Sequence, residues 1–191
     1  MSIGNPDLEG RKAPLAFAEN EARAVAEAFP ESTVAVRNEA TESLFKQAGG
    51  HFDYIHLATH GVFDPVNPLH SGLLLAEDGS NDGILTAEEL YSVNLEADLV
   101  TLSACETGLA QVANGDDLVG LARGFLYAGA KAIVASLWGV DDESTSFLMT
   151  RFYAELKSRD KQEALRQAQL AAKEKYGHPF YWAAFELTGM P

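Results

Sequence analysis

The chain has little cysteine and no long apolar run. Of its 191 residues only Cys105 is a cysteine, so an intrachain disulfide and a cysteine-based zinc cluster are excluded. No apolar stretch reaches the ~20 residues needed to cross a bilayer, and the first residues lack the charged and apolar regions of a secretory signal. We therefore expect a soluble, cytoplasmic protein with no membrane contact, in which Cys105 is a free thiol.

Basic residues are also scarce. The chain has 14 Lys and Arg against 28 Asp and Glu, a formal net charge of −14, which argues against sequence-independent nucleic-acid binding and against docking on anionic lipid. Hydrophobic residues make up 47% of the chain, enough to bury a sizeable core, so disorder as the main state is excluded. The length fits a single domain over residues 1–191.

The apolar spacing predicts alternating helices and strands. Helices are expected over residues 18–29, 41–47, 86–93, 118–126, 142–157 and 160–176. Strands are expected over 33–36, 52–60, 97–105 and 131–138, with a long loop holding a small hairpin over 62–83 and a final edge element over 180–187. This alternation predicts an α/β fold, a mostly parallel central sheet with helices on both faces.

Two reactive side chains end neighbouring predicted strands. Ligands of such sheets bind beyond the carboxyl ends of the strands, where His60 and Cys105 stand. Cysteine catalysis needs a thiolate, an imidazole and amide donors for the oxyanion, and the amides of Gly61 and Cys105 are candidate donors. The competing interpretation is an inert, buried thiol, which composition alone favours. The polar residues that follow Cys105 favour a functional site instead.

Other candidates have structural interpretations beside the functional ones. We interpret His56 as a hydrogen-bonded core histidine on the same strand face as His60, and the pair lacks a third metal ligand, so no metal or cofactor is predicted. The candidate substrate-binding residues are Asp116, Trp138, Asp141 and Asp142. Helix capping is the competing interpretation of the three aspartates. The tryptophan either forms the wall of a substrate pocket or fills the core.

Five motifs occur in a specific order along nearly the whole chain. They are residues 56–61 (HLATHG), 102–108 (LSACETG), 120–125 (GLARGF) with 128–130 (AGA), 136–142 (SLWGVDD) and 178–185 (HPFYWAAF). In this order they resemble the CHAT domain family of caspase-like proteins, which is related to caspases, separases and gingipains. The resemblance implies the caspase-type three-layer α/β sandwich.

The resemblance also implies a reaction and the residues that perform it. His60 would be the general base or acid and Cys105 the nucleophile, with the amides of Gly61 and Cys105 as the oxyanion hole. The implied reaction is hydrolysis of a peptide bond in a protein or peptide substrate through a thioester acyl-enzyme, without a cofactor. A third member of a triad is not evident in the sequence, and related enzymes often work with a Cys/His dyad.

The chain departs from its relatives in two respects. Separase relatives have an aspartate directly after the tryptophan of the Leu-Trp motif, where this chain has Gly139, so a negative pocket for Lys or Arg would come from Asp116, Asp141 or Asp142. Family members usually have further strands before residues 2–6, so we expect a CHAT domain that is incomplete at its N-terminus. It would be a truncated chain, a shortened gene product, or a minimal form in which a partner covers the sheet edge.

Three functions remain open from the sequence. The leading hypothesis is a cysteine endopeptidase of the CHAT type. The second is a catalytically silent scaffold, or a protein-interaction module that an activating or regulatory protein partner controls. The third is a redox-sensing thiol at Cys105, which would form sulfenic acid without peptidase activity.

Overall fold

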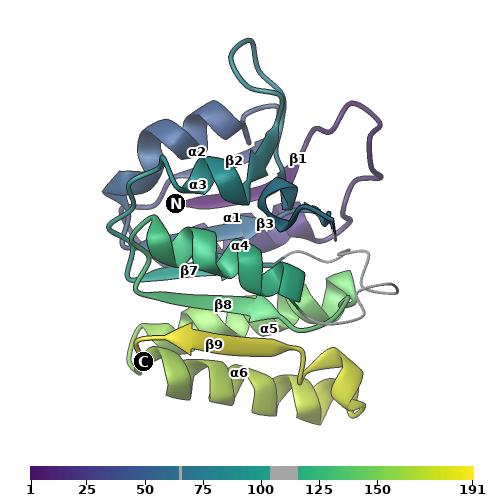
Figure 1. Ribbon diagram of the computed structural model, residues 1–191. Coiled ribbons are helices and arrows are strands. Elements are labelled where there is room, and N and C mark those ends of the chain that lie inside the picture. Colours follow the sequence, from purple (N-terminus) through teal and green to yellow (C-terminus); the bar gives the residue numbers. More distant parts are fainter. Residues whose placement is uncertain (65, 104–115) are drawn as a thin grey trace.

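A twisted central sheet runs through the whole protein (Figure 1). The computed structural model describes residues 1–64, 66–103 and 116–191, with side chains described from residue 120 onward in the last range. Within them, the sheet order is β2-β1-β3-β7-β8-β9, from β1 (Ser2–Pro6), β2 (Val34–Arg37), β3 (Tyr54–Ala58), β7 (Leu99–Leu102), β8 (Ala132–Ser136) and β9 (Phe185–Gly189). Every pairing is parallel except that of β9 with β8. The mostly parallel sheet and the C-terminal edge element are confirmed.

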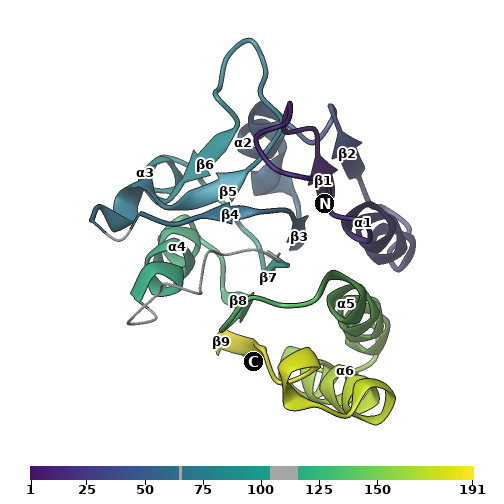
Figure 2. The ribbon, with the colours of Figure 1, turned by 90° about the vertical axis from the view of Figure 1, so that its right-hand side faces the viewer.

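Helices cover both faces of the sheet, as Figure 2 shows. They are α1 (Ala18–Glu27), α2 (Glu42–Ala48), α3 (Ala87–Leu90), α4 (Asp116–Tyr127), α5 (Asp142–Leu156) and α6 (Lys161–Tyr176). Helices α1, α5 and α6 lie on one face, and α2, α3 and α4 on the other. The three-layer sandwich is therefore confirmed. Among the described residues, no helix has the length and apolar character that a membrane span requires.

Helices α2, α3, α5 and α6 begin at residues whose side chains cap them. The side chains of Thr41, Asp141 and Asp160 accept hydrogen bonds from the amide three residues further on. Thr86 and Glu89 form the expected reciprocal capping box at the start of α3. These bonds satisfy amides that have no partner within the helix. Each of these helices therefore starts directly after its capping residue.

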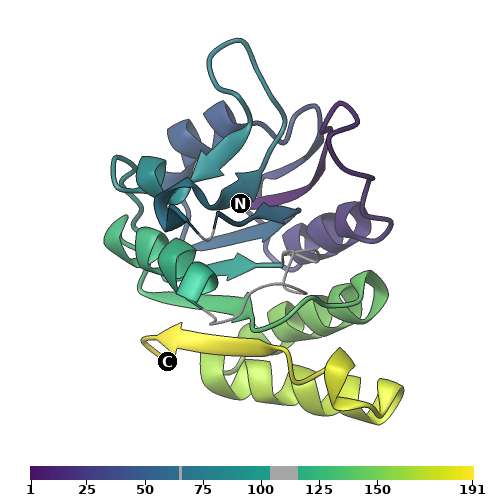
Figure 3. The same ribbon diagram turned by 45° about the vertical axis from the view of Figure 1, so that its right-hand side comes forward.

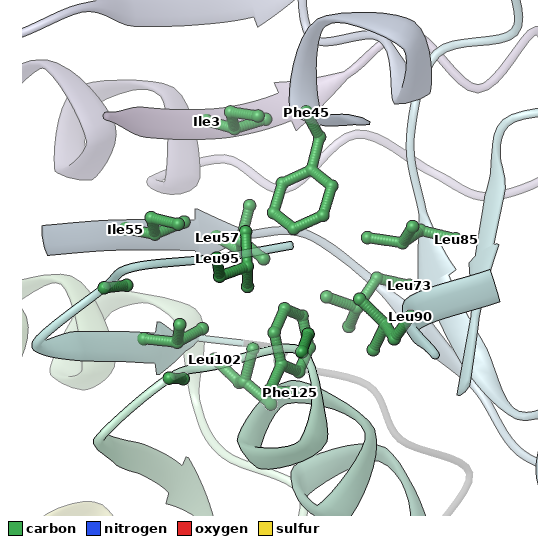
Figure 4. Packing of buried hydrophobic residues seen from close by; sticks show 14 of the residues in the cluster. Ile3, Phe45, Ile55, Leu57, Leu73, Leu85, Leu90, Leu95, Leu102 and Phe125 are labelled. Atoms are coloured by element: carbon green, nitrogen blue, oxygen red, sulfur yellow. The ribbon is translucent and has the colours of Figure 1, made fainter. Parts of the chain in front are cut away.

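The sheet separates two apolar cores. On the face of α2, α3 and α4, Phe45 and Phe125 meet edge to face with their ring centroids 6.1 Å apart, against strand residues such as Leu57 (Figure 4). On the opposite face, residues of α1, α5 and α6 pack on Leu99 and Val134. The parallel strands are buried on both sides, which explains their near-continuous apolar sequences.

The region between β3 and α3 differs from the expected loop with a hairpin. Short strands β4 (Gly61–Val62), β5 (Gly72–Leu74) and β6 (Ile84–Thr86) form a second, antiparallel sheet in the order β4-β5-β6. It lies on the side of α3 and α4, as Figure 3 shows. The predicted hairpin is part of it, but β4 is too short to carry an alternating apolar pattern.

Candidate functional site

His60 lies just beyond the carboxyl end of β3. Its side chain is 4% exposed, and its Nε2 lies 2.8 Å from the carbonyl oxygen of Ala13. A carbonyl oxygen only accepts hydrogen bonds, so Nε2 carries the proton and donates it. In the neutral imidazole the basic nitrogen is then Nδ1, the atom that can exchange a proton with a reacting group. The fold therefore sets both the orientation and the tautomer of this histidine.

The carbonyl that holds His60 belongs to the segment that joins β1 to α1, residues 7–17, which we name the strap. In Figures 1 and 3 the strap leaves β1 at the carboxyl edge of the sheet and returns to α1. Two side chains from outside the strap accept from its backbone amides: Asn5 Oδ1 accepts from the Leu15 amide at 3.0 Å, and Asp142 Oδ2 accepts from the Phe17 amide at 2.8 Å. Arg11, within the strap, donates to the carbonyls of Leu75 and Asp82.

The strand that leads toward Cys105 is the direct neighbour of the strand that leads to His60. β3 and β7 pair in parallel, and the Ser103 amide donates to the Leu57 carbonyl at 2.9 Å. This adjacency confirms the predicted order of the two strands. Cys105 follows Ser103 by two residues and lies outside the described residues, so its role as nucleophile and amide donor stays a prediction.

Gly61, the other predicted oxyanion donor, directly follows His60 in β4. It stands opposite Leu73, and the Leu74 amide donates to the His60 carbonyl at 2.8 Å. In an antiparallel pair this bond makes Gly61 and Leu73 a pair without mutual hydrogen bonds, so the Gly61 N–H points away from β5. Such a direction fits a donor for a ligand, and the oxyanion role stays a prediction.

The predicted substrate-binding aspartates have different positions. Asp141 Oδ1 accepts from the Ser144 amide at 2.9 Å and caps α5. Asp142 is half-buried, and this burial raises the pKa of its carboxyl above the ordinary value. The negative charge of Glu21 raises the pKa further, whereas the strap amides that donate to the carboxyl lower it. Asp116 is the first residue of α4, and its side chain lies outside the described residues. A substrate-binding role for these residues stays a prediction.

Trp138, the fourth of these candidates, follows β8. Its indole is partly buried against the core of α5 and α6, and its Nε1 donates to the Phe180 carbonyl at 3.2 Å. Both contacts are structural, and they orient the ring at the edge of that core. Its role in a substrate pocket stays a prediction.

His56 is a core histidine, as the sequence predicts. His56 and Glu21 are each 1% exposed, with Nε2 of the imidazole 2.9 Å from Oε1 of the carboxyl. The ring of Tyr153 stands edge-on to the imidazole, with the centroids 5.3 Å apart, and its hydroxyl donates to Thr101 Oγ1 at 2.9 Å. Burial raises the pKa of the Tyr153 phenol. In the described part of the chain, no three potential metal ligands gather into a cluster.

Sequence reasoning missed the strap and a cavity. The bond from His60 goes to a backbone carbonyl, and a carbonyl has no sequence signature, so nothing in the sequence marks Ala13. A cavity of about 450 Å³ opens at the amino ends of β1 and β3, the edge opposite His60, and is lined in part by Phe29, Tyr54 and Tyr153. These aromatic residues come from the segment after α1, from β3 and from α5, and their spacing in the sequence does not reveal their proximity.

Comparisons with known proteins agree with this architecture. The crystal structure of the Arg-specific cysteine proteinase gingipain R superposes on the whole chain, and on 45% of that protein, with a TM-score of 0.62 and 12% identity, which shows a shared fold. Tetratricopeptide repeat protein 28 is 27% identical in Homo sapiens over 98% of this chain, and 33% identical in Mus musculus over 56% of it. The chain matches only 9% and 4% of those two relatives' lengths. The family model for the CHAT domain matches residues 1–190, and the chain belongs to the CHAT domain family.

Proposed function

We propose that this domain is a cysteine endopeptidase that uses a dyad of Cys105 and His60. The observation that carries the proposal is the His60 imidazole, buried at the carboxyl edge of the sheet and held through Nε2 by the Ala13 carbonyl. A buried histidine in one tautomer, beside the strand that leads to the single cysteine, is the arrangement that a general base for a thiol requires. Membership of the caspase-like CHAT family supports the same reaction.

The proposed reaction proceeds through an acyl-enzyme. His60 Nδ1 takes the proton of the Cys105 thiol, and the sulfur attacks the carbonyl carbon of the scissile peptide. The amides of Gly61 and Cys105 stabilise the oxyanion. The C–N bond then breaks as the imidazolium returns the proton to the leaving amine, which leaves a thioester. Water, deprotonated by His60, hydrolyses the thioester and restores the thiol.

The proposed substrate is a protein or peptide. The proposed location is the cytoplasm, because a free catalytic thiol needs a reducing compartment. The carboxyls of Asp116 and Asp141 are the candidates for recognition of a basic residue before the scissile bond. The Asp142 carboxyl accepts from the strap amides instead. A regulatory protein partner remains part of the proposal, because the relatives that the chain matches are far longer than this domain.

The test uses fluorogenic peptides that differ in the residue before the scissile bond, together with a peptidyl acyloxymethyl ketone as a covalent probe. We expect turnover and labelling that Cys105→Ala abolishes and that His60→Gln lowers by about 10²-fold or more. His70→Gln, which changes an exposed histidine, is the matched control and should retain full activity. A folded protein that neither cleaves nor labels would contradict the proposal.

The two other functions predict different chemistry at the same thiol. A scaffold would alkylate with a thiol pKa near the free value of ~8.5, whereas an activated nucleophile has a lower one. A redox sensor would form sulfenic acid with peroxide while cleaving no peptide. The pH dependence of iodoacetamide alkylation identifies the scaffold, and detection of sulfenic acid by mass spectrometry after peroxide treatment identifies the redox sensor.

A further inference from the structure

The strap supplies the Ala13 carbonyl that accepts from His60 Nε2 at 2.8 Å, so the position of the strap bears on the orientation of the imidazole. The strap is an irregular segment, without helix or strand from residue 7 to residue 17. Irregular backbone keeps one geometry only where side chains or packing hold it. The residues that fix the strap therefore act on His60 from a distance.

One of these fixing groups is the carboxylate of Asp142, on a helix 125 residues further along the chain. Asp142 Oδ2 accepts from the Phe17 amide at 2.8 Å, and the Ala16 amide also donates to this carboxyl. Hydrogen bonds from amides to an ionised acceptor are shorter and stronger than neutral ones. Asp142 thereby fastens the C-terminal end of the strap to the first turn of α5.

Packing joins the same elements. Leu15 of the strap forms a small apolar cluster with Ala18 and Ala58, and Val140, which precedes α5, packs against it. Ala58 is the last residue of β3 and stands two residues before His60. The strap, the end of β3 and the start of α5 are thus in contact at one place, and the Asp142 carboxylate is the charged group that links two of them.

We propose that Asp142 is a positioning residue, which holds the strap so that the Ala13 carbonyl orients His60 for proton transfer. It acts through the strap backbone. The inference rests on the proposed function for its activity measurement, but the orientation of His60 can be measured without turnover. The acidic groups that face Asp142 are Glu21 on α1 and Asp141 beside it. Glu21 pairs with His56 and Asp141 accepts from the Ser144 amide, so neither takes the place of Asp142 as the acceptor for the strap.

The test measures His60 directly, by the NMR signal of its ring Cε1–H, assigned with His60→Gln. In Asp142→Ala we expect this signal to shift, and kcat to fall by about tenfold while KM changes less than about twofold. Asp142→Asn retains an amide oxygen that can accept from the Phe17 amide, so it should restore most of kcat. Asp160→Ala removes a capping carboxylate of the same type from α6 and should leave the His60 signal and kcat unchanged.

A second variant covers the case in which Asp142→Ala does not fold. Asn5→Gly removes the other side chain from outside the strap that accepts from its amides, and glycine tolerates the positive φ of 46° at this position. It should shift the same His60 signal. An unchanged His60 signal in folded Asp142→Ala or Asn5→Gly would overturn the inference, whatever the activity. An unlabelled wild-type Cys105 together with a shifted His60 signal would instead contradict only the proposed function.

Discussion

Glu21 and His56 join helix α1 to the middle of the sheet by a hydrogen bond between two almost fully buried side chains. A buried polar group is tolerated only when it has a partner, so each of the two residues makes the other acceptable in the core. Tyr153 from α5 packs on the imidazole and ties the second helix of this layer to the same point. The pair therefore fixes how α1 and α5 sit on β3.

Removal of the acceptor should destabilise the fold. We expect Glu21→Ala to lower the free energy of unfolding by about 2 kcal/mol, because the His56 ring would stay buried without its partner. Glu21→Gln retains an oxygen acceptor and should cost less. The matched control is Glu19→Ala on the same helix, which removes only surface ion pairs to Arg23 and Arg37 and should change stability by about 0.5 kcal/mol or less. Urea unfolding followed by circular dichroism measures all three, and equal losses in Glu21→Ala and Glu19→Ala would refute the argument.

Residue identity predicts part of the candidate site. The positions of His60 and of the residues before Cys105 follow from the rule that the carboxyl ends of parallel strands share one edge. The core role of His56 follows from its place inside a buried strand. The contact between His60 and Ala13, in contrast, joins a side chain to a backbone atom 47 residues away, and only the three-dimensional path of the strap brings them together.

At the scale of single elements, β1 shows where local pattern is insufficient. Its sequence contains Gly4 and Pro6 and lacks a run of β-branched residues, so residues 2–6 were not predicted as a strand. In the structure β1 lies between β2 and β3 and is buried throughout. A Cβ on Gly4 would lie 2.5 Å from the Ala18 carbonyl oxygen. Glycine is therefore required at this position by the close packing of α1 on β1, and β propensity plays no part in the choice.

The turn from α4 to β8 depends on one glycine. Gly129 has a φ of +113°, and a Cβ there would overlap the carbonyl oxygen of Leu95. We expect Gly129→Ala to lower the free energy of unfolding by about 3 kcal/mol or more, from the backbone strain and the clash together. Gly177→Ala is the matched control, since Gly177 also has a positive φ, of +72°, but open space around it, and it should cost only about 1 kcal/mol. Thermal unfolding of both variants measures the two losses of stability. Equal losses would mean that the contact with Leu95 is relieved by a small shift of the backbone.

At the scale of the molecule, alternation of helix and strand was sufficient to predict the sandwich. A buried strand such as β8, Ala132–Ser136, reads as one apolar run within the predicted strand 131–138, and the helix after it, from Asp142, shows the period of a surface helix. The adjacency of β3 and β7 was predicted, but the place of β1 between β2 and β3 was not, because β1 was not recognised as a strand. The sheet of β4, β5 and β6 could not be predicted from the sequence pattern. Its strands have three residues or fewer and are stabilised by the elements on which they pack.

The net charge of −14 acts on the whole molecule. Self-repulsion of a compact acidic chain destabilises the folded state, and salt screens it over a Debye length of about 10 Å at 0.1 M. We expect the melting temperature to rise by about 3 °C between 10 and 200 mM NaCl. Surface ion pairs such as Lys131 with Asp98 weaken in salt, but each contributes about 1 kcal/mol at most. A melting temperature that falls with salt would mean that these pairs outweigh the repulsion.

A variant with less net charge tests the same argument. Glu27→Lys, at an exposed position in the last turn of α1, changes the net charge from −14 to −12. Its melting temperature should depend less on salt, because less repulsion remains to be screened.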